Sequence, residues 1–109
     1  MLFLSAEGQQ MIDKTIQHIM NDKKYRRLLQ CYYNAYTAEC EVLRAEYGNA
    51  DFVSDKWTEK AHHCLVDFMF DLEDEEIKDY YLEREDDDFM TELDRQLIDQ
   101  HLSLDCPLA

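Results

Sequence analysis

Acidic, imidazole and thiol side chains meet in one short segment, at Glu59, His62, His63 and Cys64. Glu59 and His62 form an E-x-x-H pair, a spacing that places two ligands on one side of a helix. Helical di-metal sites need two such pairs and two further inward carboxylates, and the chain contains a single E-x-x-H. Zinc needs four well-spaced ligands, and the four cysteines show no paired short spacing. We expect no metal site.

A second group of carboxylates, Glu73, Glu76 and Asp79, recurs at three-residue steps that suit Mg²⁺. All-helical pyrophosphatases that resemble this arrangement carry a second E-x-x-E on a preceding helix, whereas Glu46 and Glu59 belong to no such pair. Phosphate-binding glycine loops and nucleophile elbows are also absent from a chain that has two glycines. We therefore expect no cofactor and no catalytic residue.

Arg95 and His101 make an R-x5-H spacing that resembles the HEPN class of helical ribonucleases, where a similar pair attacks RNA. The resemblance covers those seven residues and implies a ribonuclease with this pair as its catalytic residues. A net charge of −14 would repel RNA from the protein. The ribonuclease is kept as a second alternative function.

The excess of negative charge lies in the second half of the chain. Residues 1–48 hold six Lys/Arg and six Asp/Glu, whereas residues 49–109 hold five and nineteen. Eleven acids and two bases fall within residues 71–88 alone, a net of −9, and a small basic segment, KKYRR, occupies residues 23–27. The acidic run is the strongest functional signal in the sequence.

Residues 71–88, taken as one helix, would extend about 27 Å and carry one net negative charge per roughly 3 Å. A strand of B-DNA carries one phosphate per about 3.4 Å. Like charges at four-residue steps destabilise a helix, and acids near its C-terminal end oppose the helix dipole. These unfavourable terms favour a binding role, although a solvated face or pairing with KKYRR would also account for the run.

Apolar periodicity predicts an all-α fold, a single-domain bundle of four or five helices over residues 1–109 with an irregular tail at 103–109. Ser5 and Asn21 or Asp22 are expected to start the first two helices, and Gly48 to end the second. Ser54 is expected to cap a third helix, the deepest of the bundle, and Asp88 a fifth. A peripheral acidic helix, roughly 74–85, lies between them.

An aromatic stripe accompanies the second helix and continues at the start of the third. Tyrosine is common at interfaces because its ring is apolar and its hydroxyl is polar. The stripe is either the edge of the core or an apolar interface with a partner or a second copy. Its members are Tyr25, Tyr32, Tyr33, Tyr36 and Trp57.

Cysteine spacing and the N-terminus bear on location. Cys31 and Cys40 on one helix would lie about 13 Å apart, too far for a disulfide. No apolar run is long enough to span a membrane, and MLFL is too short for a secretory signal. We expect reduced thiols, a cytoplasmic protein and no membrane partner.

The leading hypothesis is a non-enzymatic, acidic helical protein that inhibits or regulates a basic partner and does not itself bind nucleic acid. In its sharpest form it is a DNA mimic that blocks a nucleic-acid-binding protein such as a restriction or CRISPR factor, and in size and acidity it resembles phage anti-defence proteins. The alternative is an adaptor or regulatory subunit that binds through the aromatic stripe. The expected partner-binding residues are Glu75, Glu76, Asp79, Glu83, Asp86, Asp87 and Asp88.

Overall fold

The computed structural model describes residues 5–84 and 87–102. These residues form five helices, α1 (Ala6–Asn21), α2 (Lys23–Tyr47), α3 (Lys56–Asp71), α4 (Glu75–Arg84) and α5 (Asp87–His101). The prediction of an all-α bundle is confirmed. The predicted irregular tail, 103–109, lies outside the described residues.

The predicted ends of the first two helices are confirmed. The Ser5 hydroxyl accepts a hydrogen bond from the Gly8 amide at 3.1 Å and starts α1. The Asp22 carboxylate accepts from the amides of Lys24 and Tyr25 at 3.0 and 3.2 Å, so a single residue ends α1 and starts α2. Gly48 ends α2 at φ 80°, a left-handed conformation that glycine adopts without a steric penalty.

Two predicted caps differ from the observed helix starts. The N-cap position of α3 is Asp55, whose side chain makes no cap bond, whereas the Ser54 hydroxyl accepts from the Lys56 amide at 3.3 Å. Asp88 does not cap α5, because that helix begins at Asp87 and places Asp88 inside the first turn. Local composition misleads in both places, because several cap-forming residues are adjacent and only the path of the chain decides which one is used.

All five helices contribute to one cluster of buried side chains. It lies where α1, α4 and α5 meet the first half of α2 and the second half of α3. A reciprocal pair of amide hydrogen bonds between Gln9 and Gln96, at 2.8 and 2.9 Å, joins α1 to α5 beside this core. Fully buried members of the core include Ile12, Ile19, Leu29, Leu65, Met69, Ile77, Met90, Leu93 and Leu97.

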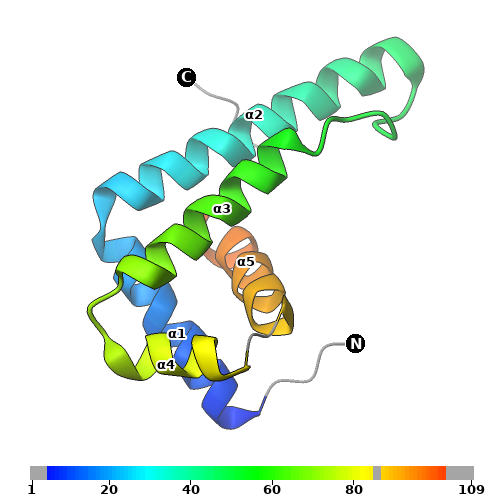
Figure 1. Cartoon of the computed structure of the whole chain (residues 1–109). Coiled ribbons are helices and arrows are strands. Elements are labelled where there is room, and N and C mark those ends of the chain that lie inside the picture. The colour runs from blue at the N-terminus through cyan, green and yellow to red at the C-terminus, as the bar shows by residue number, and fades with distance from the viewer. Residues whose placement is uncertain (1–4, 85–86, 103–109) are drawn as a thin grey trace.

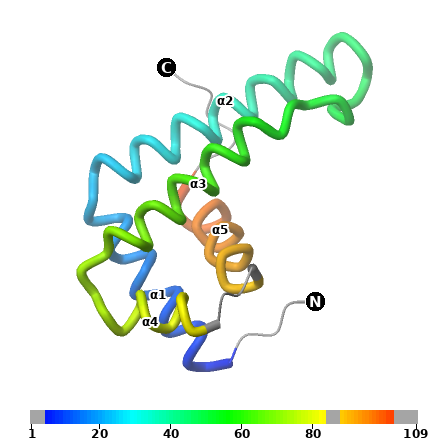
Figure 2. Tube along the Cα trace, in the orientation of Figure 1, coloured from blue at the N-terminus to red at the C-terminus, as the bar shows by residue number. Residues whose placement is uncertain are grey.

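The far ends of α2 and α3 project from the bundle as an antiparallel hairpin. Figure 1 shows the connection between these helices well away from α1, α4 and α5, and the trace in Figure 2 follows the pair side by side. The Glu39 carboxylate joins them near the tip, where it accepts from Trp57 Nε1 at 2.7 Å and from the Ser54 amide at 3.1 Å. The hairpin explains a radius of gyration of 14.9 Å, above the value of about 13 Å for a compact chain of this length.

The α3 helix is not enclosed on all sides, contrary to the expectation that it lies deepest. Ala61, Leu65 and Met69 are buried along one side, whereas Phe70 is 50% exposed on another. The apolar residues that the sequence places around α3 are therefore not all buried, and some of them remain partly exposed to solvent.

Candidate functional site

The α4 helix presents three of the predicted partner-binding carboxylates to solvent. Ile77 and Tyr80 are buried beneath the helix, and the Tyr80 ring lies 5.4 Å from that of Phe89 between centroids. Four-residue steps place the carboxylates on the opposite side. We call them the acidic α4 face: Glu75, Asp79 and Glu83, all exposed.

The start of α4 depends on Asp74, which the sequence reading did not single out. Its Oδ1 accepts from the amides of Glu76 and Ile77 at 3.1 and 3.2 Å. The same side chain lies 3.6 Å from His18 Nε2 on α1. Asp74 is therefore used inside the fold, as a helix cap and an inter-helix contact.

Glu76 is exposed, but it is paired with a side chain of α1. Its carboxylate accepts from Lys14 Nζ at 2.9 Å, and this hydrogen bond raises the pKa of Lys14. Glu76 therefore does not belong to the acidic α4 face. Asp88 is exposed in the first turn of α5, whereas the structure describes no side chain for Asp87, and Asp86 lies outside the described residues.

The acidic run does not form one continuous helix. Leu72, at φ −66° and ψ 130°, leaves the helical conformation after Asp71 and is buried, so α3 and α4 are separate elements. Within α4 four acids accompany two bases, a net of −2 over ten residues. The 27 Å length, which took residues 71–88 as one helix, therefore does not apply, whereas the separate acidic helix predicted at roughly 74–85 is confirmed.

The aromatic stripe divides between the core and its edge. Tyr33 is 2% exposed, and its hydroxyl donates to Asp94 on α5, so this residue belongs to the core and not to an open face. Tyr25 packs edge-on against Phe68 at 4.7 Å between ring centroids and donates to Asp71 at 3.4 Å. Both tyrosine hydroxyls therefore donate hydrogen bonds to carboxylates of the same chain.

The other members of the stripe are half-buried. Burial raises the pKa of Tyr36, which lies beside Cys40, and Tyr32 packs against the core. The Trp57 ring lies under the ammonium groups of Lys56 and Lys60, at 4.6 and 5.2 Å from its centroid. None of these side chains is among the most exposed apolar groups, which are Val42, Tyr47, Phe52, Phe70 and Leu82.

The residues considered for catalysis are not brought together. Arg95 pairs with Glu92 and, at 2.9 Å, with Asp99, whereas His101 lines a hollow that Arg95 does not reach. Glu73 precedes α4, so it does not share a helix face with Glu76 and Asp79.

The described residues contain no group of three His, Cys, Asp or Glu side chains arranged to hold a metal ion. Cys31, Cys40 and Cys64 are free thiols. Within that same part of the chain no helix is long and apolar enough to cross a membrane.

Asp94 is the most perturbed acid in the described structure. Burial raises its pKa to about 6. The acceptor of the Tyr33 hydroxyl is therefore partly protonated in mildly acidic solution. Nothing in the sequence singles out this pair, because its members are 61 residues apart.

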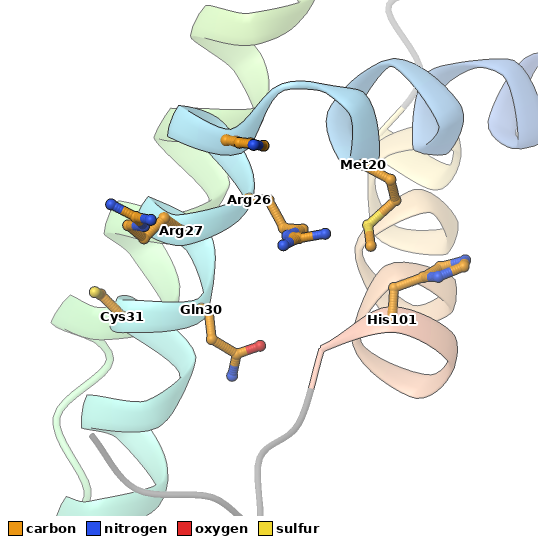
Figure 3. Close-up of a pocket in the computed structure, with 7 residues that line it drawn as sticks. Met20, Arg26, Arg27, Gln30, Cys31 and His101 are labelled. Carbon is orange, nitrogen blue, oxygen red and sulfur yellow. The ribbon is translucent and has the colours of Figure 1, made fainter. Parts of the chain in front are cut away.

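A basic hollow lies where the start of α2 meets the ends of α1 and α5. KKYRR was recognised in the sequence as a basic segment, but the hollow itself was not, because α1 and α5 complete it from distant positions. Figure 3 shows Arg26 and Gln30 directed from α2 toward Met20 and His101. The lining residues are Met20, Lys23, Arg26, Arg27, Gln30, Cys31 and His101.

Comparisons with protein-family models, curated proteins and solved structures found no match to this chain. The geometry of its own surfaces must therefore carry any functional conclusion. Two surfaces are distinctive, the acidic α4 face and the basic hollow.

Proposed function

We propose that the protein binds a basic surface of a nucleic-acid-binding protein through the acidic α4 face and thereby inhibits or regulates it. One observation carries the proposal. Glu75, Asp79 and Glu83 form an exposed line on an anchored helix, and none of them makes an ion pair with a described side chain.

The spacing of this line suggests how a partner would read it. Four helical residues rise about 6 Å, whereas two nucleotides of B-DNA rise about 6.8 Å. Successive carboxylates of the line would therefore match every second phosphate along a DNA strand. Lysine and arginine side chains that normally contact phosphates would bind these carboxylates instead, and the partner would be blocked by competition. In this form the protein is a DNA mimic of the phage anti-defence type.

Charge complementarity predicts a binding reaction that salt weakens. Exposed charges lose most of their attraction beyond about 8 Å at physiological ionic strength. The same complementarity accelerates association more than it slows dissociation. A cytoplasmic partner, and a cytoplasmic location for the protein, are part of this proposal.

The test uses a triple variant, Glu75→Gln, Asp79→Asn and Glu83→Gln. Partners are captured from host extract on the wild-type protein at low salt, and the captured protein is purified with its nucleic acid. Displacement of fluorescent nucleic acid from it is then followed by anisotropy. We expect wild-type protein to displace the nucleic acid and the triple variant to need at least about tenfold more protein.

The matched control carries the same charge change on the hairpin: Glu41→Gln, Glu46→Gln and Glu59→Gln, all exposed. This variant should displace nucleic acid as the wild type does. Equal loss in both triple variants would show that net charge alone acts. Retention of full activity by the α4 variant would refute the proposal.

A second candidate function, an adaptor with an apolar contact surface, is favoured by the tip of the hairpin. Tyr47 is 63% exposed and Phe52 75% exposed, and their rings contact each other edge-on at 6.4 Å between centroids. If this surface leads binding, Tyr47→Ser with Phe52→Ser will abolish capture of the partner and leave its salt dependence unchanged. The Tyr32→Ala and Tyr36→Ala variants test the aromatic stripe in the same way.

A further inference from the structure

The basic hollow is a concave site without a carboxylate among its described lining residues. Its volume is about 620 Å³, within the range of about 300–1,000 Å³ that small-ligand pockets occupy. A neighbouring hollow of about 510 Å³ shares Lys23, Arg27 and Cys31 with it and adds Lys24 and Leu28. The two hollows flank the same turns of α2.

Three cations are grouped on this part of α2. Positions three and four residues apart are neighbours on a helix surface, so Lys23 lies between Arg26 and Arg27. All three are exposed, and none is ion-paired with a side chain in residues 5–83 or 88–102. By contrast, Lys14 is paired with Glu76, and Arg95 with Glu92 and Asp99.

The position of these cations is unfavourable for the isolated protein. They occupy the N-terminal end of α2, where the helix dipole disfavours positive charge, and the Asp22 carboxylate at the N-cap already accepts from two of the free amides there. Lysine and arginine at three- and four-residue steps also repel one another. A bound anion would offset the repulsion among these side chains, because it would bridge the cations.

The side chains that line the hollow favour phosphate as the bound anion. Guanidinium groups form paired hydrogen bonds with phosphate oxygens, and an ammonium group adds a point charge. Arg26 is directed toward Met20 and His101, whereas Arg27 lies on the other side of α2 (Figure 3), so a ligand that contacts both must extend across Lys23, which two linked phosphates do better than one. Met20 and Leu28 provide apolar contacts at the borders of the two hollows. A long polyanion would also extend over the rest of a chain whose net charge is −14, which would repel it.

We propose that the basic hollow binds a small ligand that carries at least two linked phosphates, a diphosphate or a nucleoside diphosphate, through Lys23, Arg26 and Arg27. This site is independent of the acidic α4 face. The protein would therefore carry a ligand site beside its partner-binding surface.

Titration calorimetry of the full chain with inorganic pyrophosphate and with ADP tests the proposal. The test variant is Arg26→Gln with Arg27→Gln. Its control is Arg44→Gln with Lys60→Gln, which makes the same charge change on the hairpin. Circular dichroism checks that both remain helical. We expect wild-type and control proteins to bind both probes, and the test variant to bind them about tenfold or more weakly.

The location of binding is tested through Cys31, which lines both hollows. Saturating pyrophosphate should slow alkylation of Cys31 by N-ethylmaleimide and leave that of Cys64 unchanged, as measured by mass spectrometry of peptides. Tighter binding of ADP than of pyrophosphate would assign the apolar borders to the nucleoside. Equal affinities would assign recognition to the phosphates alone.

Three results would overturn the proposal. They are no binding of either probe at low salt, equal affinity in the test and control variants, and salt-sensitive self-association of the protein that the test variant abolishes in the absence of phosphate binding. The last result would assign the cations to the acidic surface of a second copy. The first two results leave the proposal for the acidic α4 face intact, whereas the third would assign the acidic surface to self-association.

Discussion

At the scale of single residues, the contact between Tyr33 and Asp94 combines burial with a titratable group. Burial raises the pKa of Asp94 to about 6, above the usual value of an aspartate. Between pH 4 and pH 6 the folded chain holds a proton at this site that the unfolded chain has lost. This group therefore makes the protein less stable as pH rises through that window, and its contribution is constant above it.

The Asp94→Asn variant should remove this pH dependence. Asparagine keeps an acceptor for the Tyr33 hydroxyl and has no charge to bury. We expect the variant to be more stable than wild type at pH 7 by about 1–2 kcal/mol, since a pKa unit corresponds to about 1.4 kcal/mol and solvent screens part of the difference. Urea unfolding at pH 4 and pH 7 measures it, and a difference that does not change with pH would contradict the assignment.

Removal of the Tyr33 hydroxyl tests the other half of the contact. Tyr33→Phe leaves the partly buried Asp94 carboxyl without its donor and should destabilise the protein by about 1–2 kcal/mol. Tyr25→Phe is the matched control, because its hydroxyl donates to Asp71 in an exposed position at 3.4 Å, and should change stability by less than about 0.5 kcal/mol. Equal losses of stability in the two variants would show that the burial of Asp94 does not determine the cost of removing the hydroxyl.

At the scale of elements, helix ends are determined by side chains that act on nearby amides. Asp22 accepts two backbone amides and starts α2, so Asp22→Ala should cost about 1 kcal/mol. Asp55 occupies the same position before α3 but makes no such side-chain bond, and Asp55→Ala should leave the thermal midpoint nearly unchanged. Thermal unfolding compares the two, and a larger loss for Asp55→Ala would refute this reading of the caps.

The elements also show which parts of the fold could be predicted from the sequence. Ser5, Asp22 and Gly48 act within a few residues of themselves, so local pattern was sufficient for them. Local pattern also predicts a separate acidic helix near α4, but not that Asp74 caps it and that Glu76 pairs with Lys14, because those contacts depend on how α4 packs against α1. The pairing of Tyr33 with Asp94 depends on how α5 crosses the bundle, and so does the position of His101 in the same hollow as the start of α2.

At the scale of the whole molecule, charge is the property that connects structure with function. A net charge of −14 means that the folded chain repels itself. Salt reduces that repulsion, and it also weakens the attraction to a basic partner. Added salt is therefore expected both to stabilise the protein and to release its partner. The two effects can be compared over the same range of salt concentration.

The acidic α4 face should be unfavourable for stability if it is kept for binding. Glu75, Asp79 and Glu83 repel one another at four-residue steps, and each such pair costs a few tenths of a kcal/mol. The triple variant Glu75→Gln, Asp79→Asn and Glu83→Gln should therefore gain about 0.5–1 kcal/mol at low salt, and the gain should shrink at 1 M salt, where charges are screened within about 3 Å.

The hairpin variant Glu41→Gln, Glu46→Gln and Glu59→Gln separates this local effect from net charge. It removes the same number of charges, but Glu59 lies on a different helix from the other two, and Glu41 and Glu46 are not at a three- or four-residue step. Its gain at low salt should be smaller. Thermal unfolding at 20 mM and 1 M salt measures both variants. If the α4 variant is less stable than wild type, those carboxylates contribute to folding, and their position does not require a partner.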